Sequence, residues 1–112
     1  VLIGIQAESC APLWSKVNGV SNSGSEGETL AEGVRIRHPH RVEALLEAVQ
    51  SNGGEFLAVA EDQILPGRDN LAQRGLYVEL TSALVWDGLR QVSGEVPDPI
   101  VAILTGSGLK DG

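Results

Sequence analysis

Three short apolar runs constrain the fold of this chain more than any other feature. Val1–Ala7 and Glu55–Ala60 consist mainly of apolar residues, and Ile100–Leu104 holds five of them in succession. Apolar runs of this length, bounded by turn residues, are typical of strands that are buried on both faces of a sheet. The sequence therefore predicts three strands, the last of which opens into the turn Thr105–Gly108.

Segments with helical periodicity separate these runs. Arg41–Ser51 places its apolar side chains on one stripe, and Ser82–Val92 is apolar almost all round, which predicts a helix packed between other elements. A shorter helix is expected at Cys10–Val17, with Pro12 in its first turn. Alternation of strands and helices favours an α/β fold, with a mainly parallel sheet between two helical layers.

Two segments are less regular. Asn18–Glu28 is rich in Gly, Ser and Asn and has no periodicity, so a mobile loop is expected there. The segment after Glu61 has a helical stripe that contains Pro66. Because a proline inside a helix costs about 3 kcal/mol, either this helix starts late, with Pro66 in its first turn, or it is broken there.

Size and charge exclude several classes of protein. At 112 residues the chain forms one domain, residues 1–112, and its net charge of −7 is scattered along it. No basic patch is available for nucleic acid, and no apolar run approaches the roughly 18 residues of a membrane span. The single Cys10 permits no internal disulfide and favours the cytoplasm. Because the chain lacks Met and opens inside an apolar run, we expect a piece of a longer protein.

Known catalytic signatures are absent from the sequence. No Gly-Lys pair of a phosphate loop occurs, and no helix can follow Gly106-Ser107-Gly108 as a nucleophile elbow requires. We expect His38 and His40 to be solvated rather than metal ligands, and Cys10 to be buried rather than reactive. Lys16 and Lys110 lie in surface-like segments, where nothing lowers an amine pKa for imine chemistry.

Thr105 is the first candidate for a functional residue. In open α/β sheets, ligands bind beyond the carboxyl ends of the strands, where glycines allow close approach of the backbone and a hydroxyl can form one directed hydrogen bond. Spacing alone leaves the alternative open that the segment after Leu104 is only a frayed tail. Glu79, just before the last predicted helix, is expected to cap local N–H groups.

Four segments together resemble one known family. Leu104–Asp111 resembles the LTGxGLKD stretch of the threonine synthases, which belong to the fold type II pyridoxal-phosphate enzymes. Gln6–Pro12 resembles the strand-to-helix segment of that family, Thr29–Ile36 its TLAxxIRI segment, and Glu79–Ala83 its EPxSAA segment. The resemblance covers essentially the whole chain, and the segments occur in the family's order. Leu80 departs from the family's proline, and Pro66-Gly67 falls where the family has an unbroken helix.

The resemblance implies a pyridoxal phosphate site. It implies that the Thr105 hydroxyl hydrogen-bonds the pyridine nitrogen of the cofactor, and that Ala31, Glu32 and Gly33 lie near the cofactor. A neutral hydroxyl does not hold the ring nitrogen protonated as a carboxylate would, so a moderated electron sink is expected. The imine-forming lysine and the glycine-rich phosphate loop precede this region in such enzymes and are not in this sequence. No residue of this chain is therefore expected to be catalytic, and no metal site is expected.

These implications define the expected function. The parent protein is expected to be a lyase that turns O-phospho-L-homoserine and water into L-threonine and phosphate, as a cytoplasmic homodimer. The present chain would be its C-terminal part, inactive without the preceding polypeptide. A threonine or serine dehydratase-like member of the same fold remains an alternative, as does a free-standing α/β binding module.

Overall fold

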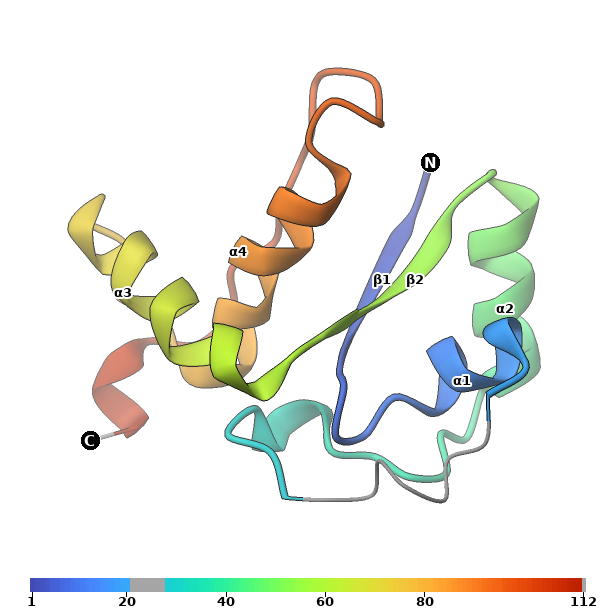
Figure 1. Cartoon of the computed structure of the whole chain (residues 1–112), viewed down its shortest axis with the longest axis horizontal. Coiled ribbons are helices and arrows are strands. Elements are labelled where there is room, and N and C mark those ends of the chain that lie inside the picture. The colour runs from blue at the N-terminus through green and yellow to red at the C-terminus, as the bar shows by residue number, and fades with distance from the viewer. Residues whose placement is uncertain (21–27, 112) are drawn as a thin grey trace.

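The computed structural model describes residues 1–20 and 28–111. Most of the predicted mobile loop, residues 21–27, lies outside the described residues. The order of elements, shown in Figure 1, is β1 (Ile3–Ala7), α1 (Pro12–Asn18), η2 (Glu32–Val34), α2 (Val42–Ser51), β2 (Glu55–Val59), η3 (Glu61–Gln63), α3 (Ile64–Gln73), α4 (Leu80–Val92) and η4 (Gly108–Asp111). The elements named η are single 3-10 turns.

The two strands pair in parallel and lie between two layers of helices. The register runs from Ile3 opposite Glu55 to Ala7 opposite Val59. Phe56 packs with the buried Leu13 of α1 and Leu46 of α2 on one face, whereas β1 meets α4 on the other. Figure 1 shows α1 and α2 on one side of the strands and α3 and α4 on the opposite side. The predicted α/β class and its layered arrangement are thus confirmed.

The prediction of a third strand is wrong. Ile100–Leu104 forms no strand, and the side chains of Val101 and Ile103 are 84% and 75% exposed. A strand needs a neighbour for its backbone N–H and C=O groups, and within residues 1–20 and 28–111 β1 pairs only with β2. The run instead forms one wall of an apolar groove.

The apolar groove lies between the N-terminal strand, helix α4 and the C-terminal segment. Its lining includes residues 1–3 and Ile5, four residues of α4, and residues 99–103. Val1, Leu2 and Ile100 are also large apolar residues with exposed surface. The run Ile100–Leu104 therefore has the composition of a buried strand but meets too few described residues to be buried.

Helices α3 and α4 pack closely on each other. Pro66 falls in the first turn of α3, so of the two alternatives for this segment, the structure has the one without a break. A Cβ atom at Gly67 would lie 2.8 Å from the Ala83 carbonyl oxygen, so the contact between the helices requires glycine there. Helix α4 begins at Leu80, two residues before the predicted start, which places Glu79 at its N-cap position.

None of the helices within residues 1–20 and 28–111 has the length and the apolar character that a bilayer crossing requires.

Candidate functional site

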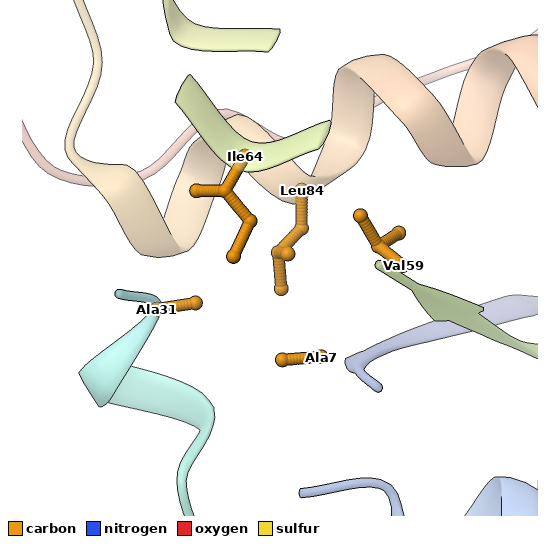
Figure 2. Packing of buried hydrophobic residues seen from close by; sticks show 5 residues of the cluster. All are labelled: Ala7, Ala31, Val59, Ile64 and Leu84. Atoms are coloured by element: carbon orange, nitrogen blue, oxygen red, sulfur yellow. The ribbon is translucent and has the colours of Figure 1, made fainter. Parts of the chain in front are cut away.

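The carboxyl ends of β1 and β2 meet the start of α4 in one buried cluster. Figure 2 shows Ala7 and Val59, the last residues of the two strands, facing Ala31, Ile64 and Leu84. Ala31 and Val59 are 0% exposed, and Leu84 lies in the second turn of α4. This packing fixes the turn η2, which follows Ala31, beside the first turn of α4. The strand ends and the predicted cofactor residues are thus on the same side of the molecule.

Glu79 joins the C-terminal segment to the start of α4. The Thr105 hydroxyl donates a hydrogen bond to Glu79 Oε1 at 2.9 Å, and the backbone N–H of Gly106 donates to the same oxygen at 2.9 Å. The N–H of Glu79 in turn donates to the Gly106 carbonyl oxygen at 3.0 Å. Lys110 forms an ion pair with the other carboxylate oxygen, Oε2. We call Glu79, Thr105, Gly106 and Lys110 the Glu79 clamp.

The clamp keeps the Glu79 carboxylate ionised. The hydrogen bond from Lys110, followed by those from Thr105 and Gly106, lowers the pKa of Glu79 below its ordinary value, because each favours the charged form. The side chain of Glu79 is only 14% exposed, so little water competes for its oxygens. A carboxylate that accepts bonds at both oxygens is held in one orientation.

Gly106 is required by the geometry of the clamp. A Cβ atom there would lie 2.6 Å from Cδ of Glu79 and 2.7 Å from its Oε1. Real Cβ atoms do not approach other atoms so closely, so any side chain at this position would displace the carboxylate. The backbone is also fixed one residue earlier, where the Thr105 N–H donates to Oγ of Ser82 at 2.9 Å.

The first turn of α4 also forms a hydrogen bond with the segment Ala31–Gly33, which the family resemblance places near the cofactor. The backbone N–H of Gly33 donates to Oγ1 of Thr81 at 2.9 Å, and a Cβ atom at Gly33 would lie 2.8 Å from that oxygen. Thr81 and Ser82 are neighbours, so adjacent side chains of one helical turn bond η2 and the Thr105 segment. Two segments some 70 residues apart in sequence therefore meet at one helix start.

The predicted site residues differ in how they are presented. Thr105, Glu32 and Gly33 lie at the surface, whereas the methyl group of Ala31 is buried in the core. Glu79 does not cap its own helix, contrary to the sequence prediction: no side-chain bond to the first N–H groups of α4 forms. Its carboxylate instead accepts hydrogen bonds from Thr105 and Gly106. These residues are distant in sequence, and the fold brings them to Glu79.

Sequence reasoning did not assign the supporting residues Thr81, Ser82 and Lys110. Their signal was present, because Thr81 and Ser82 belong to the resembling segment Glu79–Ala83, and Lys110 to Leu104–Asp111. Their contacts span tens of residues, however, and spacing along the chain does not reveal them.

Burial and exposure differ among the remaining candidates. Cys10 is buried, and His38 and His40 are exposed. Over the ranges 1–20 and 28–111, no three His, Cys, Asp or Glu side chains gather as a metal site would require. Lys16 pairs with Glu43 at 3.2 Å, so both lysines of the chain are bound to carboxylates.

Comparison with known proteins decides the family. The model of the pyridoxal-phosphate dependent enzymes matches residues 1–106, which is nearly the entire chain. The chain belongs to the pyridoxal-phosphate-dependent enzymes. The fold type II expectation and the cofactor of the family are thereby confirmed.

Three relatives named threonine synthase are similar to nearly the whole of this chain. The threonine synthase of Methanocaldococcus jannaschii is 32% identical over 98% of this chain and 29% of its own length. The threonine synthases of Synechocystis sp. and Mycobacterium leprae are each 34% identical over 98% of this chain, and over 28% and 31% of their own lengths. The chain thus spans less than a third of the relatives that it matches.

The residues present fit one side of a pyridoxal phosphate site. Thr105 offers an exposed hydroxyl whose backbone and side chain are both anchored, and Gly106 beside it carries no side chain that would block a flat ring. Gly33, from the second predicted segment, is held at the same helix start. When bound, the cofactor of this family supplies an electron sink, and Thr105 and Gly33 are the residues present here that would hold it.

Proposed function

We propose that this chain is the C-terminal part of a threonine synthase, which converts O-phospho-L-homoserine and water to L-threonine and phosphate. The observation that carries the proposal is the anchored, exposed Thr105 hydroxyl beyond the carboxyl ends of the parallel strands, in a chain whose relatives named above are threonine synthases. Substrates of this class are small amino acids.

In this proposal Thr105 would hold the ring nitrogen of the cofactor, and Glu32 and the backbone of Gly33 would line the same site. Ala31 contributes indirectly, because its buried methyl group fixes the backbone that carries both residues. The chain supplies no covalent anchor, because both of its lysines are held by carboxylates at the surface. The lysine that binds the cofactor and the loop that binds its phosphate are assigned to the rest of the polypeptide.

The apolar groove supports a larger parent protein. The relatives are more than three times as long as the segment that they share with this chain, and the groove exposes apolar residues along β1 and Ile100–Leu104. We propose that the rest of the polypeptide packs on this groove, because an exposed apolar surface of this kind is stabilised when another segment buries it. From the family resemblance we also expect the parent to be a cytoplasmic homodimer.

The test compares variants of the full-length protein that carries this segment. Thr105→Val keeps the size of the side chain but removes the hydroxyl, whereas Thr105→Ser keeps the hydroxyl. We expect Thr105→Val to weaken pyridoxal phosphate binding about tenfold, as loss of one good hydrogen bond of ~1.4 kcal/mol predicts, and Thr105→Ser to stay near the wild type. Equilibrium dialysis measures the affinity.

Activity identifies the reaction. The wild-type protein with pyridoxal phosphate should release inorganic phosphate and L-threonine from O-phospho-L-homoserine. Release of ammonia and a keto acid from threonine or serine, without phosphate release, would instead identify the dehydratase-like alternative. A full-length protein that binds no pyridoxal phosphate would contradict both.

A further inference from the structure

A separate recess lies beside α1, in the helical layer that Figure 1 shows on the side of the strands away from α3 and α4. It has a volume of about 330 Å³ and lies between α1 and the segment that leads into α2. Its polar lining consists of Ser15 and Lys16 from α1 and of Arg37 and His38 from that segment. We call the surface formed by these four residues the basic recess.

The basic recess differs in charge from the rest of the chain. The sequence holds 15 Asp and Glu but only 8 Lys and Arg, which gives a net charge of −7. Among the lining residues that the structure describes, Lys16 and Arg37 are cationic and His38 adds an imidazole, whereas none is Asp or Glu. Cationic side chains gathered without acidic neighbours create a local positive potential, which favours a bound anion.

The hydroxyl of Ser15 is a second, independent feature of this recess. Ser15 is only 3% exposed and lines the recess, and within residues 1–20 and 28–111 its hydroxyl forms no hydrogen bond. Buried polar side chains are normally hydrogen-bonded, so an unpartnered one needs an explanation. A hydroxyl at a positively charged recess can donate its proton to an oxygen of a bound anion.

Lys16 is held only weakly by its present partner. Its ammonium group lies 3.2 Å from a carboxylate oxygen of Glu43, and the two side chains are 56% and 86% exposed. Ion pairs this exposed contribute little, because water and salt screen them. A doubly charged anion in the recess can therefore compete with Glu43 for the ammonium group of Lys16.

We propose that the basic recess binds a phosphate group, either as inorganic phosphate or as part of a phosphomonoester. A phosphate group offers three strong acceptor oxygens, and the recess offers the hydroxyl of Ser15, the ammonium of Lys16 and the guanidinium of Arg37 as donors. A carboxylate has only two oxygens and would leave one of these donors without a partner. Arg37 has further interactions, but its five N–H groups allow it to bind a phosphate as well.

The experiment measures how phosphate protects Lys16 from acetylation by acetic anhydride in the full-length protein. Mass spectrometry of the peptide that contains Lys16 gives the rate, and Lys110 is the internal reference. The probes are inorganic phosphate and glycerol 3-phosphate, with sodium chloride at equal ionic strength as the control. We expect inorganic phosphate to slow the reaction of Lys16 about tenfold at a concentration roughly ten times its Kd, and chloride to have no such effect. Protection by glycerol 3-phosphate alone would identify the ligand as a phosphomonoester.

Matched variants test the individual donors. Ser15→Ala and Arg37→Gln should each remove most of the protection of Lys16. Arg35→Gln removes an exposed positive charge that does not line the recess, so protection should stay. Glu43→Gln removes the competing carboxylate, so protection should appear at a lower phosphate concentration. Circular dichroism checks the folding of each variant.

Three outcomes would overturn the phosphate site. These are equal protection by chloride, protection that survives both Ser15→Ala and Arg37→Gln, and a Lys16 that does not react even without phosphate because the rest of the polypeptide covers it. The proposed function is tested separately, since the recess lies apart from the residues assigned to the cofactor. A protein that protects Lys16 but binds no pyridoxal phosphate would contradict the proposed function and leave the phosphate site intact.

Discussion

The hydroxyl of Thr105 and the carboxylate of Glu79 meet at 2.9 Å, although 26 positions separate them in the sequence. The bond closes a loop that contains all of helix α4 and the segment that follows it. One acidic side chain at the N-cap position of α4 therefore sets both where the C-terminal segment lies and which way its hydroxyl points. The predictions below test this arrangement and the packing around it in the full-length protein.

Replacing Gly106 by alanine should open the clamp. The added Cβ would lie 2.6 Å from Cδ of Glu79, so the carboxylate must move and lose its bonds to Thr105 and Gly106. We expect a loss of about 1–3 kcal/mol in the free energy of unfolding, measured by urea denaturation. In a Glu79→Ala background the same change should cost much less, because the colliding group is gone. Equal costs in both backgrounds would show that the contact is unimportant.

The contribution of Glu79 to stability should depend on pH in one direction only. Its folded-state pKa is lowered from 4.5, chiefly by Lys110 and then by Thr105, so the stabilisation is present above pH 4.5 and is lost as the pH falls through the lowered folded-state value. Urea denaturation of the wild type and of Glu79→Gln at a series of pH values measures the difference. The two curves should converge on acidification, and curves that stay parallel into the acid range would refute the assignment.

Ala31 should tolerate no larger side chain. It is 0% exposed between the strand ends and helices α3 and α4, so Ala31→Leu would overpack the cluster shown in Figure 2. We expect a destabilisation of about 1–3 kcal/mol in thermal or urea unfolding. Ala72→Leu is the control, since Ala72 lies on the exposed face of α3. Similar effects at the two positions would contradict the described packing.

Charged residues placed in the apolar groove should have opposite effects on two proteins. They should reduce self-association of the chain alone but impair folding of the full-length protein. Val101 and Ile103 are among the most exposed large apolar residues, so the chain alone should self-associate, and Val101→Lys with Ile103→Lys should raise its monomer fraction. Sedimentation velocity measures that fraction.

Under the proposal that the rest of the polypeptide covers the groove, the same pair of changes should lower the yield of folded full-length protein. Val17→Lys with Leu45→Lys, at exposed apolar positions outside the groove lining, is the matched control. If the full-length protein tolerates both pairs equally, the groove is not covered by the remaining polypeptide.

Much of the fold could be predicted because its signals are local. Helix α2 follows from one apolar stripe, and the paired strands follow from apolar runs bounded by turns. Ile100–Leu104 carries the same kind of signal and forms no strand, since an apolar run specifies burial but not the neighbour that supplies it. The prediction failed where the required partner is not among the described residues.

In the candidate site, too, residues with a local signal could be predicted, whereas contacts between distant residues could not. The place of Thr105 after an apolar run makes it a candidate, and resemblance to a family makes Ala31, Glu32 and Gly33 candidates; these assignments stay predictions. The role of Glu79 was misjudged, because capping rules consider the nearest N–H groups, whereas its partners lie 26 and 27 positions away. Contacts of that kind depend on how the chain folds back on α4, and no periodicity encodes them.

The burial of Ala31 has a consequence for how proteins of this kind can diverge. Its methyl group packs against the ends of both strands and so fixes the segment that follows. An insertion or deletion between Ala31 and Gly33 would therefore remove that methyl group from the core. The exposed side chain at position 32 can therefore be exchanged without disturbing this packing, whereas the length of the peptide that carries it cannot change.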